Sequence, residues 1–96
     1  MNNIYLTLYD YCINGNLDDV IFLYYTNSID IRQENDKIFK DCCNLLLINT
    51  NIDDEKYKNK LDVLLFLCTL CSFYYMRIEN KKLISWKIDE KFTIII

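Results

Sequence analysis

The chain has 96 residues, of which 52% are hydrophobic and 15% aromatic, and it carries a formal net charge of −3 with no histidine. This composition excludes a disordered chain, because such chains lack the apolar surface that offsets the entropy lost on ordering. It also lacks the basic excess of a nucleic-acid-binding domain, so no nucleic-acid partner is expected. The absence of histidine removes the commonest general base and metal ligand.

Turn-forming residues are scarce, since the chain has one glycine and no proline. An all-β domain of this length needs several of both, so the composition favours helices joined by polar turns. The length fits a single domain over residues 1–96. We expect an all-α fold of about five helices with short extended connectors. The predicted helices lie near residues 3–13, 17–26, 36–48, 54–71 and 81–90, and the connectors near 28–33 and 73–78.

Local signals mark where these helices begin, end and face the core. Gly15 stands between the first two, where a glycine can take the left-handed conformation that ends a helix. Asn35 and Asn80 are predicted N-caps, because a side-chain oxygen there accepts an N–H of the next turn. Two helices are predicted to bury an apolar stripe that recurs every three residues. The stripe residues are Leu17, Val20 and Leu23 with Phe22, and Leu61, Leu64 and Leu67 with Phe66.

Residues 63–76 form an uncharged apolar run between Asp62 and Arg77. The run spans 14 residues, whereas a helix that crosses a bilayer needs roughly 20. We therefore expect a buried core helix. The alternative is an interfacial segment of a peripheral membrane protein.

The chain contains an internal repeat. Residues 17–23 and 61–67 share the pattern L-D-x-[VL]-[IL]-F-L, at an offset of 44 residues. Residues 31–39 and 76–84 share the pattern [IM]-R-x-E-N-x-K-[IL]-[FI], at an offset of 45 residues. The repeat predicts a unit made of a helix, an extended connector, a cap and a second helix.

One half of the repeat resembles a known family. Residues 11–23 resemble the centre of an ankyrin repeat, A-C-x-x-G-[HN]-L-x-x-V-x-x-L, although the usual T-P-L-H tetrapeptide is absent. Residues 29–36 resemble a divergent ankyrin turn, D-I-R-x-[DE]-N, found in proteins of giant DNA viruses of amoebae. An unrelated helical bundle is the alternative interpretation. The resemblance implies about two to three degenerate repeats, near residues 4–30, 31–75 with an insert at about 49–60, and 76–96 as a partial repeat.

The ankyrin resemblance implies a non-enzymatic protein–protein interaction module, and for a viral protein a host or viral partner. The eight tyrosines of the chain support this expectation, because tyrosine is common at interfaces. A self-assembling homodimer is the alternative, since an array this short leaves its ends without polar caps. The predicted partner-binding residues are Tyr24, Tyr25, Arg32, Gln33, Glu34, Tyr74, Tyr75 and Arg77.

The cysteines and acidic residues do not form a predicted catalytic or metal site. Five cysteines without a recognisable secretion leader favour a reducing compartment, so we expect a cytoplasmic location, which for a viral protein is the host cytoplasm. Cys68 and Cys71, with Cys42 and Cys43, could supply four thiols to zinc, but they lie in apolar segments and are better interpreted as buried thiols. The acidic clusters lie near predicted helix ends, where carboxylates act as caps. No catalytic residue, metal or cofactor is expected.

Overall fold

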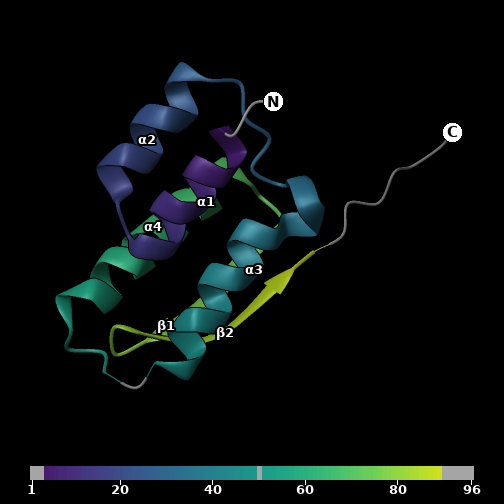
Figure 1. The fold of residues 1–96 in the computed structure, drawn as a ribbon. Helices are drawn as coiled ribbons and strands as arrows, with labels where there is room; N and C mark the ends of the chain where they lie inside the picture. Colours follow the sequence, from purple (N-terminus) through teal and green to yellow (C-terminus); the bar gives the residue numbers. More distant parts are fainter. Residues whose placement is uncertain (1–3, 50, 90–96) are drawn as a thin grey trace, which may run out of the picture.

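The structure is a computed structural model that describes residues 4–49 and 51–89. Within these ranges four helices are followed by an antiparallel β-hairpin, so the domain is α+β (Figure 1). The elements are α1 (Ile4–Asn14), α2 (Leu17–Thr26), α3 (Gln33–Ile48), α4 (Glu55–Leu70), β1 (Tyr74–Glu79) and β2 (Lys82–Ile88).

The predicted all-α fold with about five helices is wrong. The first four predicted helices correspond to α1, α2, α3 and α4, but the fifth, near residues 81–90, is β2 over its described part. The connector predicted near residues 73–78 is the partner strand β1. Ser85 and Lys87 are exposed whereas Trp86 and Ile88 are half-buried. This period of two is that of a strand with one face on the core.

The two asparagines predicted as N-caps both take left-handed backbone conformations instead. Asn80 and Lys81, with φ of 51° and 63°, form the two-residue turn of the hairpin, in which Glu79 pairs with Lys82. Asn35 lies in a left-handed turn at the start of α3, with φ of 57°. Asparagine tolerates this conformation better than most residues. The repeated E-N motif therefore encodes a left-handed turn that precedes a helix in one copy and a strand in the other.

Helix α4 is the centre of the fold, because it contacts α1, α2, α3 and β1. The run 63–76, predicted as a buried helix, is buried only in part, since Leu65 and Tyr75 are exposed; the helix ends at Leu70 and the chain then enters β1. No helix within the described ranges is long and apolar enough to cross a membrane. The buried residues of the run are Val63, Leu64, Leu67, Cys71 and Tyr74.

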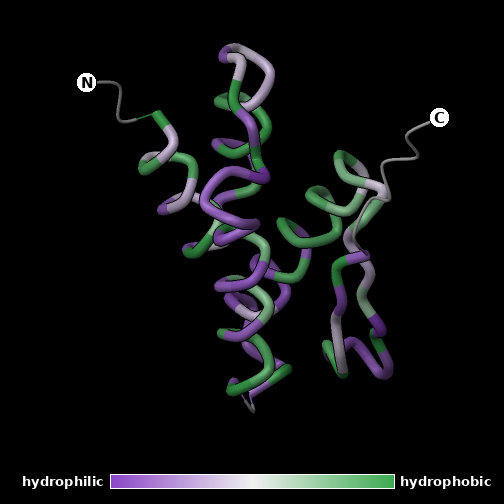
Figure 2. Tube along the Cα trace, turned by 90° about the vertical axis from the view of Figure 1, so that its right-hand side faces the viewer, coloured by the Kyte–Doolittle hydropathy of each residue, from purple (hydrophilic) through white to green (hydrophobic). Residues whose placement is uncertain are grey.

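The hairpin packs on the helices through one face. The ring of Tyr74 stacks on Phe39 of α3 at 4.0 Å between centroids, and Trp86 meets Phe39 edge-on at 5.9 Å. The backbone N–H of Leu83 donates to the Tyr57 hydroxyl of α4 at 2.8 Å. The hairpin turn is hydrophilic (Figure 2). These contacts fix the hairpin by its inward side chains and leave its outer face exposed.

The turn between α1 and α2 packs closely on α4. Gly15 has a φ of 75°, which confirms the predicted left-handed end of the first helix. A Cβ at this position would lie 3.0 Å from the backbone N of Lys60 and 3.1 Å from Asn59. The start of α2 is thereby held against the second turn of α4.

Candidate functional site

The eight predicted partner-binding residues do not form one cluster. Tyr24 and Tyr25 lie on the last turn of α2, and the other six lie at the start of α3 or on β1. Within the described ranges, no hydrogen bond, ion pair or ring contact joins the two tyrosines of α2 to the other six. The predicted residues therefore belong to two separate parts of the fold.

Arg32 and Tyr74 converge on Asp36, a buried carboxylate that is 6% exposed. Arg32 donates from Nε and Nη2 to the two Asp36 oxygens at 2.7 and 3.0 Å, and the Tyr74 hydroxyl donates to Oδ1 at 2.7 Å. The Arg32 bridge, with the Tyr74 hydrogen bond, holds the pKa of Asp36 below its ordinary value. Burial, followed by the same hydrogen bond, raises the pKa of Tyr74. This cluster ties the left-handed turn to β1.

The Arg32 guanidinium is also held by two rings, because it lies 5.2 Å from the centroid of Phe73 and 5.7 Å from that of Tyr74. Tyr74 itself is only 4% exposed. Its ring cannot contact a partner without a rearrangement of the core. Arg32 and Tyr74 therefore stabilise the fold and are not free to bind a partner.

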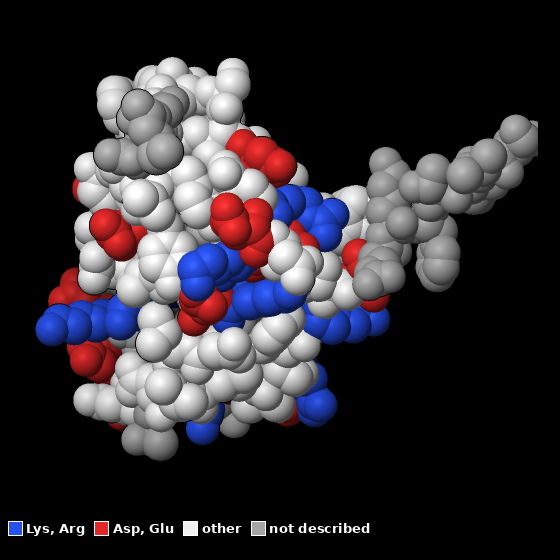
Figure 3. Space-filling view, turned by 45° about the vertical axis from the view of Figure 1, so that its right-hand side comes forward, with Lys and Arg blue, Asp and Glu red and all other residues white. Residues whose placement is uncertain are grey.

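The remaining predicted residues, Gln33, Glu34, Tyr75 and Arg77, are exposed or partly exposed. Where they contact another described side chain or backbone group, that group is close by in sequence or on the paired strand. The Gln33 amide donates to the Asp30 carbonyl at 3.1 Å, and Glu34 is exposed on the left-handed turn. Lys87 lies 5.1 Å from the Tyr75 ring, and the neighbouring Arg77 pairs with a glutamate two residues later. On the face shown in Figure 3, acidic and basic side chains lie next to one another in a band, and no continuous basic patch is present.

The two aromatic side chains with the highest exposed fraction among the described residues, Phe22 and Tyr25, lie on α2 beside α4. The rings of Tyr24 and Tyr25 contact each other edge-on with 5.1 Å between centroids, and each contacts the ring of Phe66 of α4, with centroid distances of 6.2 and 6.3 Å. Tyr25 and Phe22 are both 68% exposed, and residues three apart on a helix are surface neighbours. These four residues (Phe22, Tyr24, Tyr25 and Phe66) are called the aromatic surface.

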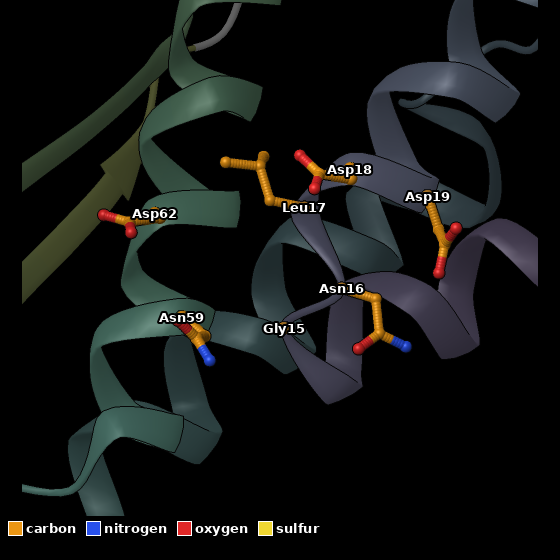
Figure 4. A pocket seen from close by; sticks show the side chains of 7 residues that line it. All are labelled: Gly15, Asn16, Leu17, Asp18, Asp19, Asn59 and Asp62. Carbon is orange, nitrogen blue, oxygen red and sulfur yellow. The ribbon is translucent and has the colours of Figure 1, made fainter.

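A hollow of about 400 Å³ lies at the other end of α2 (Figure 4). Its residues come from the α1–α2 turn, the first turn of α2 and the first half of α4. They are Gly15, Asn16, Leu17, Asp18, Asp19, Asn59 and Asp62, and the hollow is called the acidic hollow.

The acidic hollow carries negative charge that the described residues do not fully neutralise. Asp62 pairs with Lys58 at 3.1 Å, but Asp18 and Asp19 form no ion pair with any residue in the described ranges. Both occupy the first turn of α2, where the helix dipole favours negative charge. A cation near this hollow would meet carboxylates and no lysine or arginine in its lining.

The cysteines do not form a metal site in the described part of the chain. Cys12, Cys42, Cys43 and Cys71 are buried, as predicted, and Cys68 is half-buried. Burial raises the pKa of Cys12 to about 12 and that of Cys68 to about 11, which keeps both thiols protonated near neutral pH. No three His, Cys, Asp or Glu side chains within residues 4–49 and 51–89 are grouped so that they could hold a metal ion.

The sequence pattern assigns both Phe22 and Phe66 to buried stripes, but Phe22 is exposed, whereas Phe66 is half-buried and packs against the core. Helical phase carries the missing signal, because each residue advances about 100° around the axis. Phe22 therefore points roughly 200° away from Val20, which is buried. The other stripe residues are buried or packed against the core.

No family model, curated protein or solved structure matches this chain.

Proposed function

We propose that this chain is a non-enzymatic protein–protein interaction module that binds its partner through the aromatic surface. One observation carries the proposal: Phe22 and Tyr25 are neighbours on α2, and each is 68% exposed. Large exposed aromatic side chains are costly in water and are enriched at the centres of interfaces. Covering both rings contributes about 2–4 kcal/mol to binding.

The internal contacts of the aromatic surface support the same proposal. Tyr24 and Phe66 both contact Tyr25 and so restrict the positions that this exposed ring can take. A restricted side chain loses little entropy on binding, which improves affinity. The resemblance of residues 11–23 to an ankyrin repeat supports a protein partner as well. The resemblance of residues 29–36 to a divergent viral ankyrin turn further supports a host or viral partner in the cytoplasm.

A photo-cross-linking experiment tests the proposal. A benzoylphenylalanine replaces Phe22 in the full chain, which is expressed in the cells from which the sequence comes and irradiated. We expect one dominant cross-linked protein, whose capture is blocked by excess wild-type chain but not by excess Phe22→Ser/Tyr25→Ser chain. The matched control carries the same photo-reactive residue at Ser85, which is exposed on the outer face of the hairpin. The same products from positions 22 and 85 would overturn the proposal.

A second candidate function is self-association into a homodimer. A groove of about 310 Å³ between α1 and α3 is lined by Tyr9, Ile13, Asp41, Asn44, Leu45 and Ile48. Ile48 is 76% exposed, and Leu45 is 37% exposed. A second copy that covered this groove would bury both side chains. Light-scattering mass over a concentration series tests this function, and a mass that stays monomeric at high concentration removes it.

A further inference from the structure

The chemistry of the partner can be inferred if the proposed function holds, because the aromatic surface and the acidic hollow lie along the same two helices. Gly15, just before α2, lies against Asn59 of α4, whereas Tyr24 and Tyr25 at the end of α2 lie against Phe66. The later residues of α2 thus contact the later residues of α4. Helices α2 and α4 therefore run parallel and side by side.

The two parallel helices present the same residues in the same order. On α2, Asp18 precedes Phe22 by four residues, and on α4, Asp62 precedes Phe66 by four. Four residues are about one helical turn, so each aspartate lies roughly 6 Å before its phenylalanine. These are positions that the two copies of the internal L-D-x-x-x-F-L repeat share. The surface thus has an acidic end and an aromatic end, and both helices contribute to each.

The negative charge at the acidic end is available to a partner. Asp18 and Asp19 form no ion pair within the described ranges. The Asp62–Lys58 pair is exposed, with 73% of the lysine side chain and 34% of the aspartate side chain accessible. Such surface pairs contribute little stability and exchange readily. A lysine or arginine of a partner would find at least two unpaired carboxylates there.

We propose that the α2–α4 surface binds an amphipathic helix that carries two large apolar side chains followed by a lysine or arginine. Asp18, Phe22 and Tyr25 are spaced by four and then three residues on one face of α2. A helix alongside α2 has the same rise per residue, so its anchors repeat this spacing. Its apolar residues cover Phe22 and Tyr25, and its basic residue enters the acidic hollow.

The helix dipoles fix the direction of the bound segment. The N-terminal end of α2, which carries partial positive charge, lies at the acidic end. The C-terminal end of a partner helix carries partial negative charge, and basic residues are favoured there. The partner helix therefore runs antiparallel to α2 and reads apolar-x-x-apolar-x-x-x-[Lys/Arg]. An anionic membrane surface does not fit, because the acidic hollow repels it.

The test selects peptides of about 16 residues, long enough to form a helix, from a randomised display library with the full wild-type chain as bait. Binding of the selected peptides is then measured by fluorescence anisotropy for three variants. The variants are Asp18→Asn/Asp62→Asn, Phe22→Ser/Tyr25→Ser, and the matched control Asp53→Asn/Glu55→Gln, whose two acids are exposed before and at the start of α4. Circular dichroism confirms that each variant is folded.

We expect the selected peptides to share the apolar-x-x-apolar-x-x-x-[Lys/Arg] order. The Asp18/Asp62 variant should bind them about tenfold more weakly, the control variant should bind as the wild type does, and added salt should weaken wild-type binding. Peptides that need Phe22 and Tyr25 but lack a basic residue, or carry it at the opposite end, overturn this inference and leave the proposed function standing. If no selected peptide depends on Phe22 and Tyr25, both proposals fail.

Discussion

The hydroxyl of Tyr74 donates a 2.7 Å hydrogen bond to Asp36 and so joins the first strand of the hairpin to the left-handed turn at the start of α3. Both side chains are buried. Glu34, Asn35 and Asp36 all have positive φ, a conformation that costs roughly 1–2 kcal/mol for each ordinary residue. The contacts of Asp36 with Tyr74 and Arg32 offset part of this cost and hold the turn in place.

Removing only the Tyr74 hydroxyl should destabilise the domain. Tyr74→Phe keeps the ring stacked on Phe39 but deletes a buried hydrogen bond to a charged group, so the free energy of unfolding should fall by about 1.5–3 kcal/mol. Urea denaturation measures the change. Tyr75→Phe is the matched control. Because Tyr75 is 45% exposed, loss of its hydroxyl should change the free energy of unfolding by less than about 0.5 kcal/mol. Equal effects at the two positions would contradict the role assigned to this hydrogen bond.

The buried carboxylate also predicts how stability depends on pH. Arg32 and Tyr74 hold the pKa of Asp36 in the folded protein below its ordinary value of 3.8. The unfolded chain therefore binds a proton more readily, so the stabilisation is complete well above that value and is lost as the pH falls through the folded pKa. Unfolding curves recorded between about pH 6 and about pH 2 should show a smaller loss for Asp36→Asn than for the wild type. Asp41, whose pKa is also lowered, is present in both proteins and does not affect the difference.

The hairpin turn should become more stable when its second residue is glycine. Lys81 has a φ of 63°, and the second central position of such a turn favours glycine. Lys81→Gly relieves a strain of roughly 1–2 kcal/mol and adds an entropy cost of roughly 0.5–1 kcal/mol, so the free energy of unfolding should rise by about 0.5–1 kcal/mol. Thermal unfolding measures it. Lys82→Gly, one residue later in β2, should instead lower stability, and a gain at both positions would refute the turn assignment.

Two phenylalanines should separate binding from folding. Phe39 is fully buried and Phe22 is 68% exposed. Phe39→Ala should therefore cost about 3–5 kcal/mol and leave the domain largely unfolded, whereas Phe22→Ala should change stability by less than about 0.5 kcal/mol. Circular dichroism and denaturation compare the two variants. A large loss of stability for Phe22→Ala would mean that this ring packs in the core and cannot serve as a free binding residue.

The helical part of the fold could be predicted from local sequence, because the signals that define it are local. Gly15 marks the end of the first helix, and the spacing of Leu61, Leu64 and Leu67 places α4 with its buried side inward. The hairpin could not be predicted in this way. The residues after Asn80 follow the same pattern as those after Asn35. Both asparagines are left-handed, but the first precedes a helix and the second a strand. The outcome depends on pairing with β1 and on packing against Phe39, which are contacts between distant residues.

The candidate site shows the same division between local and distant information. Tyr24 and Tyr25, predicted as partner-binding residues, lie beside Phe66, but no local signal separates Tyr74 from Tyr75. On a strand, adjacent side chains point to opposite faces, so Tyr74 is buried and Tyr75 is exposed. Asp18 and Asp62 line the same hollow only because α2 and α4 are parallel neighbours, and local sequence does not contain that information. The repeat supplied those residues, although its interpretation as an all-helical array was wrong.

The central position of α4 has a consequence for cooperativity. Because all five other elements contact α4, a local opening of this helix would also disrupt the packing of the remaining core. A ligand that bridges α2 and α4 would therefore slow hydrogen exchange throughout the domain, by an amount set by its concentration relative to its dissociation constant. A ligand bound at this one surface would therefore make the whole domain more resistant to unfolding and to proteolysis.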